Sequence, residues 1–136
     1  MNPLDKKRIQ IAFKFFINKL GILGEPITLK YKMLEGDNAE VFITRSPDGK
    51  YKSFVVNVNE KDDISLDVKI TAVAHELAHV QQLTTGRLDI QKKMWDGKVI
   101  DQSNYWHLPW ENDARMQSRD LWVEFNRYTR NKNDKV

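Results

Sequence analysis

The chain lacks cysteine, is poor in glycine and proline, and has no long apolar run. Its 136 residues include no Cys, 6 Gly and 4 Pro. Without cysteine there can be no disulfide framework, thiolate metal site or cysteine nucleophile, so any metal ion must be held by His, Asp or Glu. Residues 1–8 are mostly polar, and charged residues interrupt the apolar stretch that follows. We therefore expect neither a signal peptide nor a membrane span, and we expect a cytoplasmic protein.

Neither sign of charge dominates the sequence. Lys and Arg number 22 against 19 Asp and Glu, a net charge of +3. The two signs are mixed along the chain, and only residues 127–135 are locally basic, so we do not expect a nucleic-acid interface. Hydrophobic residues make up 40% of the chain, enough for a folded core. The length predicts a single domain over residues 1–136.

The spacing of apolar residues predicts the order of helices and strands. Three amphipathic helices are expected, at Leu4–Leu20, at Leu66–Leu83 and from Pro109 to about Tyr128. Three strands are expected after the first helix, at Ile27–Met33, Ala39–Thr44 and Tyr51–Val58. Ser46-Pro47-Asp48-Gly49 predicts a hairpin turn between the last two strands, and Met94–Ile100 predicts a second, smaller hairpin. The sequence therefore predicts an α+β fold with a small three-stranded sheet.

The second predicted helix contains HELAH at residues 75–79, the pattern HExxH. His75 and His79 are four residues apart and lie on one helix face, where their imidazoles can bind one tetrahedral cation. Glu76 is offset by about 100°, so its carboxylate lies beside such an ion and can transfer a proton. The alternative is a solvated helix with two accidental histidines. Because Glu76 is the only charged residue in 72–80, the sequence favours burial over that alternative.

A catalytic zinc site needs a third protein ligand, and the downstream candidates are His107, Glu111 and Asp113. On the predicted last helix Glu111 shares the apolar face, whereas Asp113 lies about 200° away and is expected to point to solvent. Burying an uncompensated carboxylate costs on the order of several kcal/mol, which favours Glu111 as a ligand. Alternatively, Glu111 is a first-turn carboxylate paired with Arg115, or His107 is the third ligand.

HELAH, followed by Glu111 within PWENDA, resembles the zincin metallopeptidases, and in particular minimal single-domain gluzincins, whose third zinc ligand is a glutamate. The resemblance covers residues 51–125. It implies a small mixed sheet, an HExxH helix and a following helix that carries the third ligand. It also implies Zn²⁺ as the cofactor, His75, His79 and Glu111 as ligands, and Glu76 as general base and acid. Many gluzincins place an Asp four residues after the ligand Glu to orient a metal-binding histidine, but this chain has an arginine there.

The same resemblance suggests where a substrate binds. Peptide substrates in the family pair with an edge strand, which predicts a peptide or protein substrate along Tyr51–Asn59; the alternative is an ordinary structural strand. Tyr105 and His107 precede the last helix and are the side chains placed to stabilise a tetrahedral intermediate. The four tryptophans either shape a substrate pocket or pack in the core.

The leading hypothesis is a zinc-dependent metallohydrolase, a peptidase that cleaves a restricted intracellular protein or peptide with metal-activated water. The competing hypothesis is a non-catalytic zincin-fold module that captures a partner strand. A third uses the basic segment 127–135 to dock on nucleic acid or an acidic protein.

Overall fold

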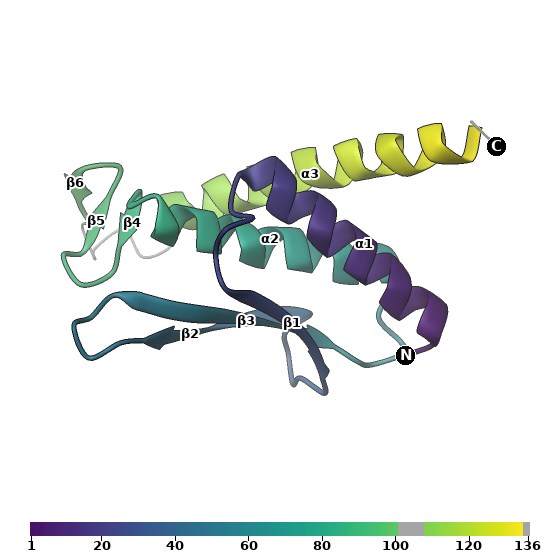
Figure 1. Ribbon diagram of the computed structural model, residues 1–136, viewed down its shortest axis with the longest axis horizontal. Helices are drawn as coiled ribbons and strands as arrows, with labels where there is room; N and C mark the ends of the chain where they lie inside the picture. Colours follow the sequence, from purple (N-terminus) through teal and green to yellow (C-terminus); the bar gives the residue numbers. More distant parts are fainter. Residues whose placement is uncertain (101–107, 135–136) are drawn as a thin grey trace.

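Three helices lie on one side of a three-stranded sheet (Figure 1). The computed structural model describes residues 1–100 and 108–134. The helices are α1 (Pro3–Leu20), α2 (Leu66–Thr84) and α3 (Pro109–Asp134). The sheet consists of β1 (Ile27–Lys32), β2 (Ala39–Arg45) and β3 (Tyr51–Asn59). The predicted α+β class and these six elements are confirmed, and α3 extends a few residues beyond its expected end.

Local signals explain where the first two helices begin and where α1 ends. The Asn2 side chain accepts a hydrogen bond of 2.8 Å from the backbone N–H of Asp5, and Ser65 accepts one of 3.2 Å from Val68 at the start of α2. Such caps satisfy backbone donors that have no partner within the helix. Gly21 ends α1 with φ of 71°, a left-handed conformation that glycine adopts without steric cost.

The central strand of the sheet is β3, which pairs in parallel with β1 and antiparallel with β2. The predicted hairpin between β2 and β3 is confirmed, with Gly49 donating a 2.9 Å hydrogen bond to the carbonyl of Ser46. The prediction that Tyr51–Asn59 is an edge strand is wrong. The second half of β3 is almost entirely buried, and an apolar strand buries most surface when strands flank it on both sides. In the part of the chain that the structure describes, the edges of this sheet are β1 and β2.

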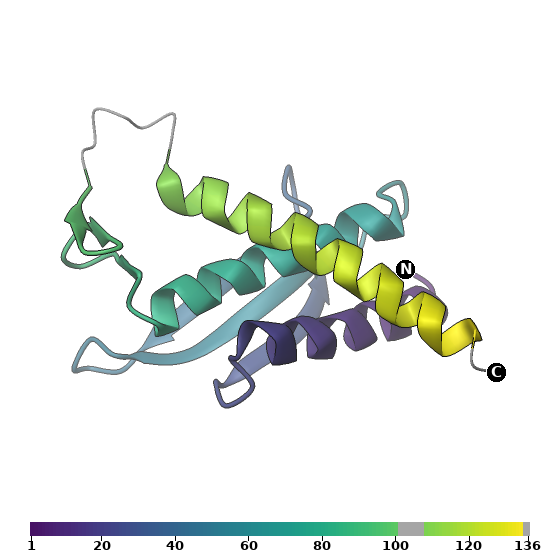
Figure 2. The ribbon, with the colours of Figure 1, turned by 90° about the horizontal axis from the view of Figure 1, so that it is seen from above.

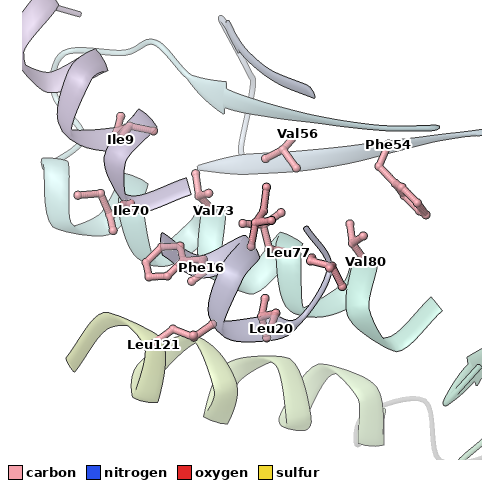
Figure 3. Close-up of a cluster of buried hydrophobic side chains, with 14 of the residues drawn as sticks. Ile9, Phe16, Leu20, Phe54, Val56, Ile70, Val73, Leu77, Val80 and Leu121 are labelled. Carbon is pink, nitrogen blue, oxygen red and sulfur yellow. The ribbon is translucent and has the colours of Figure 1, made fainter. Parts of the chain in front are cut away.

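The hydrophobic core packs α2 against the sheet and against both other helices (Figures 1 and 3). Side chains from α1, β3, α2 and α3 meet in one buried cluster that includes Phe16, Val56, Val73, Leu77 and Leu121. Seen from above, α3 crosses α2, and its second half reaches α1 (Figure 2). Packing on several sides fixes the position of α2 and of the HExxH residues that it carries.

A second small sheet follows α2. It consists of β4 (Leu88–Asp89), β5 (Met94–Trp95) and β6 (Lys98–Val99), in antiparallel order. The predicted second hairpin is confirmed, since β5 and β6 are joined by Asp96 and Gly97, both with positive φ. The pairing of β4 with β5 was not predicted. Within residues 1–100 and 108–134, no helix combines the length and apolar character needed to cross a membrane.

Candidate metal centre

The HExxH segment of α2 brings its two histidines together, as predicted. The Nε2 atoms of His75 and His79 are 3.1 Å apart, and the two rings are almost perpendicular. Their side chains are only 22% and 13% exposed. Both imidazoles therefore face a partly enclosed space in which water competes weakly for their nitrogen atoms.

Glu111, in the first turn of α3, adds a carboxylate to the two imidazoles. Its Oε2 lies 3.1 Å from Nε2 of His75, and its Oε1 lies 2.9 Å from Nε2 of His79. Ala114, one turn further along, is fully buried, so its small side chain suits the packing of α3 on α2. Arg115 donates to Asn112 at 3.3 Å instead of pairing with Glu111. Glu111 thus lies in the first turn of α3, as its alternative interpretation had it, but it faces the two histidines and not Arg115.

The three groups fit a divalent metal ion. Their facing atoms are separated by 2.9 to 3.1 Å. A tetrahedral zinc ion with bonds of about 2.0–2.1 Å separates its ligands by about 3.3 Å, so small side-chain movements accommodate it. Two imidazoles and one carboxylate are the three protein ligands of one common class of catalytic zinc site, which leaves a fourth position open. The group His75, His79 and Glu111 could therefore hold a metal ion.

The short distances between these side chains shift the pKa values of Glu111 and His79 in the metal-free protein. Hydrogen bonds to His75 and His79 hold the pKa of Glu111 well below its usual range. Burial opposes a charge on His79, but hydrogen bonds to Glu111 and Gln82 outweigh burial and raise its pKa. A carboxylate and a protonated imidazole thus stabilise each other until a cation replaces the proton.

Glu76 lies beside this group with a different proton affinity. Burial raises its pKa above the usual glutamate value, although His79 and His75 partly oppose the shift. A carboxylate whose pKa is raised toward neutrality is suited to accept and then release a proton. Glu76 also lines a cavity next to the two histidines, so a molecule in that cavity can reach it.

The cavity has a volume of about 770 Å³ and lies between the first half of α2, α3 and residues 37–39 at the start of β2. His75 and Glu76 form the end of its wall nearest the candidate ligands. Apolar side chains, among them Val68, Trp122 and Val123, contribute much of the remaining lining. Of the four tryptophans, Trp122 therefore helps to shape this pocket.

A buried hydrogen-bond network that was not predicted lies behind His79. Gln82 is fully buried, and its Oε1 lies 2.9 Å from Nδ1 of His79. Its Nε2 donates to the backbone carbonyl of Trp110 at 2.8 Å and to Asp113 at 2.9 Å. Asp113 also accepts hydrogen bonds from Gln117 at 2.6 Å and from Arg87 at 3.2 and 3.3 Å.

The expectation that Asp113 points to solvent is wrong, because its side chain is only 23% exposed and has these partners. Gln82 of α2 and Arg87 lie beside Asp113 and cover it. The sequence carried one signal for the network: Gln82 lies three residues after His79 and on the same side of the helix.

Two predicted catalytic side chains, Tyr105 and His107, lie outside the described residues. Their predicted contact with a tetrahedral intermediate stays a prediction. The same holds for His107 as an alternative ligand. Comparison of the chain with protein-family models, with curated proteins and with solved structures finds no match.

Proposed function

We propose that the chain is a zinc-dependent peptidase with a minimal zincin-like fold. The observation that carries this proposal is the meeting of the two imidazoles of His75 and His79 with the carboxylate of Glu111, through contacts of 2.9 to 3.1 Å. Glu76 lies next to this group at the end of an open cavity. A structural metal site would leave no place for a reacting molecule, whereas this arrangement combines an ion site, a proton acceptor and an adjoining space.

His75, His79 and Glu111 would hold the zinc ion. When bound, zinc supplies Lewis-acid chemistry, since it polarises a carbonyl oxygen and lowers the pKa of water. Glu76 accepts the proton of the attacking water as the water oxygen forms a bond to the carbonyl carbon. Glu76 then delivers this proton to the amide nitrogen as the carbon–nitrogen bond breaks. Burial of Glu76 supports both steps, because it makes the carboxylate more basic.

The substrate proposed for this site is an extended peptide that pairs with β2 rather than with β3. Within residues 1–100 and 108–134, β2 has one side of its backbone unpaired in the sheet order β1-β3-β2. Its first residue, Ala39, lines the cavity beside Glu76. Main-chain pairing along a free edge binds a peptide independently of its sequence, and the cavity would accept one side chain. A restricted intracellular protein or peptide remains the proposed target.

The test compares Glu76→Gln with Glu124→Gln, a matched change at an exposed position of α3. Zinc content is measured by elemental analysis, and peptide cleavage is followed by mass spectrometry on a peptide library. The wild type and Glu124→Gln should contain near-stoichiometric zinc and cleave peptides. Glu76→Gln should keep its zinc and lose turnover by about 10²- to 10⁴-fold.

Two results would contradict the proposal. Undiminished cleavage by Glu76→Gln would remove Glu76 from the reaction. A wild type that binds zinc and peptides but cleaves none would favour the alternative, a non-catalytic module that captures a partner strand.

A further inference from the structure

We propose that Gln82 is a positioning residue that keeps the proton of His79 on Nδ1 and so presents an unprotonated Nε2 to the metal. This inference rests on the zinc site of the proposed function, although not on its peptidase activity. The carrying observation is the 2.9 Å contact between Oε1 of Gln82 and Nδ1 of His79, made by a side chain that is fully buried.

The orientation of the Gln82 amide follows from its other partners. Its second polar atom lies 2.8 Å from the carbonyl oxygen of Trp110 and 2.9 Å from a carboxylate oxygen of Asp113. Both partners are acceptors, so the atom that faces them must be the NH₂ group. The amide oxygen consequently faces His79. Because that oxygen can only accept, Nδ1 of His79 must carry a hydrogen.

The network also fixes Asp113 as an acceptor. Gln117 donates to it at 2.6 Å, and the two terminal nitrogens of Arg87 donate at 3.2 and 3.3 Å. Arg87 in turn binds Asp96 in the β5–β6 turn at 2.9 Å. Reversing the Gln82 amide would place its oxygen against the carbonyl of Trp110 and the carboxylate of Asp113. The low polarity of a fully buried position makes such repulsion costly.

Gln82 thereby supplies a contact that the sequence left without a candidate. Arg115 occupies the α3 position where the family resemblance places an orienting Asp, and it hydrogen-bonds to Asn112 instead. The orienting group comes from α2 itself, three residues after the ligand it contacts. Hydrogen bonds of this kind fix the tautomer and the orientation of a ligand histidine, and losing one typically costs about 10- to 100-fold in metal affinity.

The test measures the zinc dissociation constant by competition with a chelator in the full-length protein. Gln82→Met keeps the volume and removes the acceptor, whereas Gln82→Glu keeps an acceptor but places a charge beside Asp113. The matched control is Gln81→Met, the neighbouring residue on the same helix. We expect Gln82→Met to weaken zinc binding about 10- to 100-fold. Gln82→Glu should bind zinc more tightly than Gln82→Met, and Gln81→Met should stay within about threefold of the wild type.

A packing role for Gln82 predicts the opposite order, because methionine suits a buried position better than a second carboxylate does. Zinc affinity of Gln82→Met that equals or exceeds that of Gln82→Glu would therefore overturn the inference. A second readout needs no variant. Nitrogen-15 spectra of the zinc-loaded wild type should show His79 bound through Nε2, with a slowly exchanging Nδ1–H. Binding through Nδ1 would overturn the inference.

The two proposals fail in different ways. Zinc binding that depends on Gln82 without peptide cleavage would refute the peptidase and leave the positioning role standing. Cleavage that is unaffected by Gln82→Met at limiting zinc would refute the positioning role and leave the peptidase standing. A wild type that binds no zinc would refute both.

Discussion

Removal of the Glu111 carboxylate is the sharpest test of the proposed ligand set, because Glu111 is the candidate ligand that α3 contributes. Zinc bound by a complete set of protein ligands gains about 10–16 kcal/mol, or roughly 2.5–4 kcal/mol per ligand. Glu111→Ala should therefore weaken zinc binding by about 70- to 1,000-fold. Glu111→Asp withdraws the carboxylate by about one bond length from imidazoles that lie 2.9 and 3.1 Å away in the wild type. The zinc affinity of Glu111→Asp should therefore lie between those of the wild type and Glu111→Ala.

The fold should survive this substitution. Glu111 is 35% exposed, and as a first-turn carboxylate it contributes about 0.3–1 kcal/mol to α3, to which its hydrogen bonds to His75 and His79 add in the metal-free protein. Metal-free Glu111→Ala should therefore melt at a lower temperature than the wild type, but still in one cooperative transition. Zinc affinity is measured by chelator competition and melting by circular dichroism, with Glu124→Ala as the control at an exposed site on the same helix. Zinc affinity of Glu111→Ala within threefold of the wild type would refute the ligand set, whatever its stability.

Three further predictions concern pH, the cavity and the core. In the metal-free protein, the lowered pKa of Glu111 stabilises the fold above about pH 4.5, and this stabilisation is lost as the pH falls. The raised pKa of His79 stabilises the fold below about pH 6.5, and that stabilisation is lost as the pH rises. Urea unfolding should therefore show a contribution of this pair that is largest between these values and absent in Glu111→Ala. Val123→Trp, which fills the cavity, should lower kcat/KM at least about tenfold without releasing zinc, whereas Met116→Trp, exposed on the same helix, should change neither quantity. Leu77→Ala, a fully buried position, should cost about 2–5 kcal/mol in urea unfolding, and a loss below about 1 kcal/mol would contradict the packing around α2.

The helices and strands could be predicted because each is marked by local signals. Apolar spacing, the cap at Asn2 and the turn at Gly49 depend on residues close in sequence. The order of the strands does not. Whether β3 is central or at an edge depends on β1 joining it in parallel across the intervening β2, a contact between distant segments that burial in the complete fold decides.

The candidate ligands were predictable for a related reason. His75 and His79 are linked by the helical repeat, and Glu111 is distinguished by its position on an apolar helix face. These arguments use only the geometry of one helix at a time. They did not identify the role of Gln82 and they placed Asp113 in solvent, because the geometry of a single helix does not show which residues of other elements lie beside a side chain.

The hydrogen-bond network around Gln82 also links the two helices that carry the candidate ligands. Gln82 contacts His79 on α2, and the same amide holds the carbonyl of Trp110 and the side chain of Asp113, which flank Glu111 on α3. One buried side chain therefore orients one candidate ligand and docks the helical turn that carries another. Gln82 therefore contacts one candidate ligand and the turn that carries the other, in a chain that has an arginine at position 115.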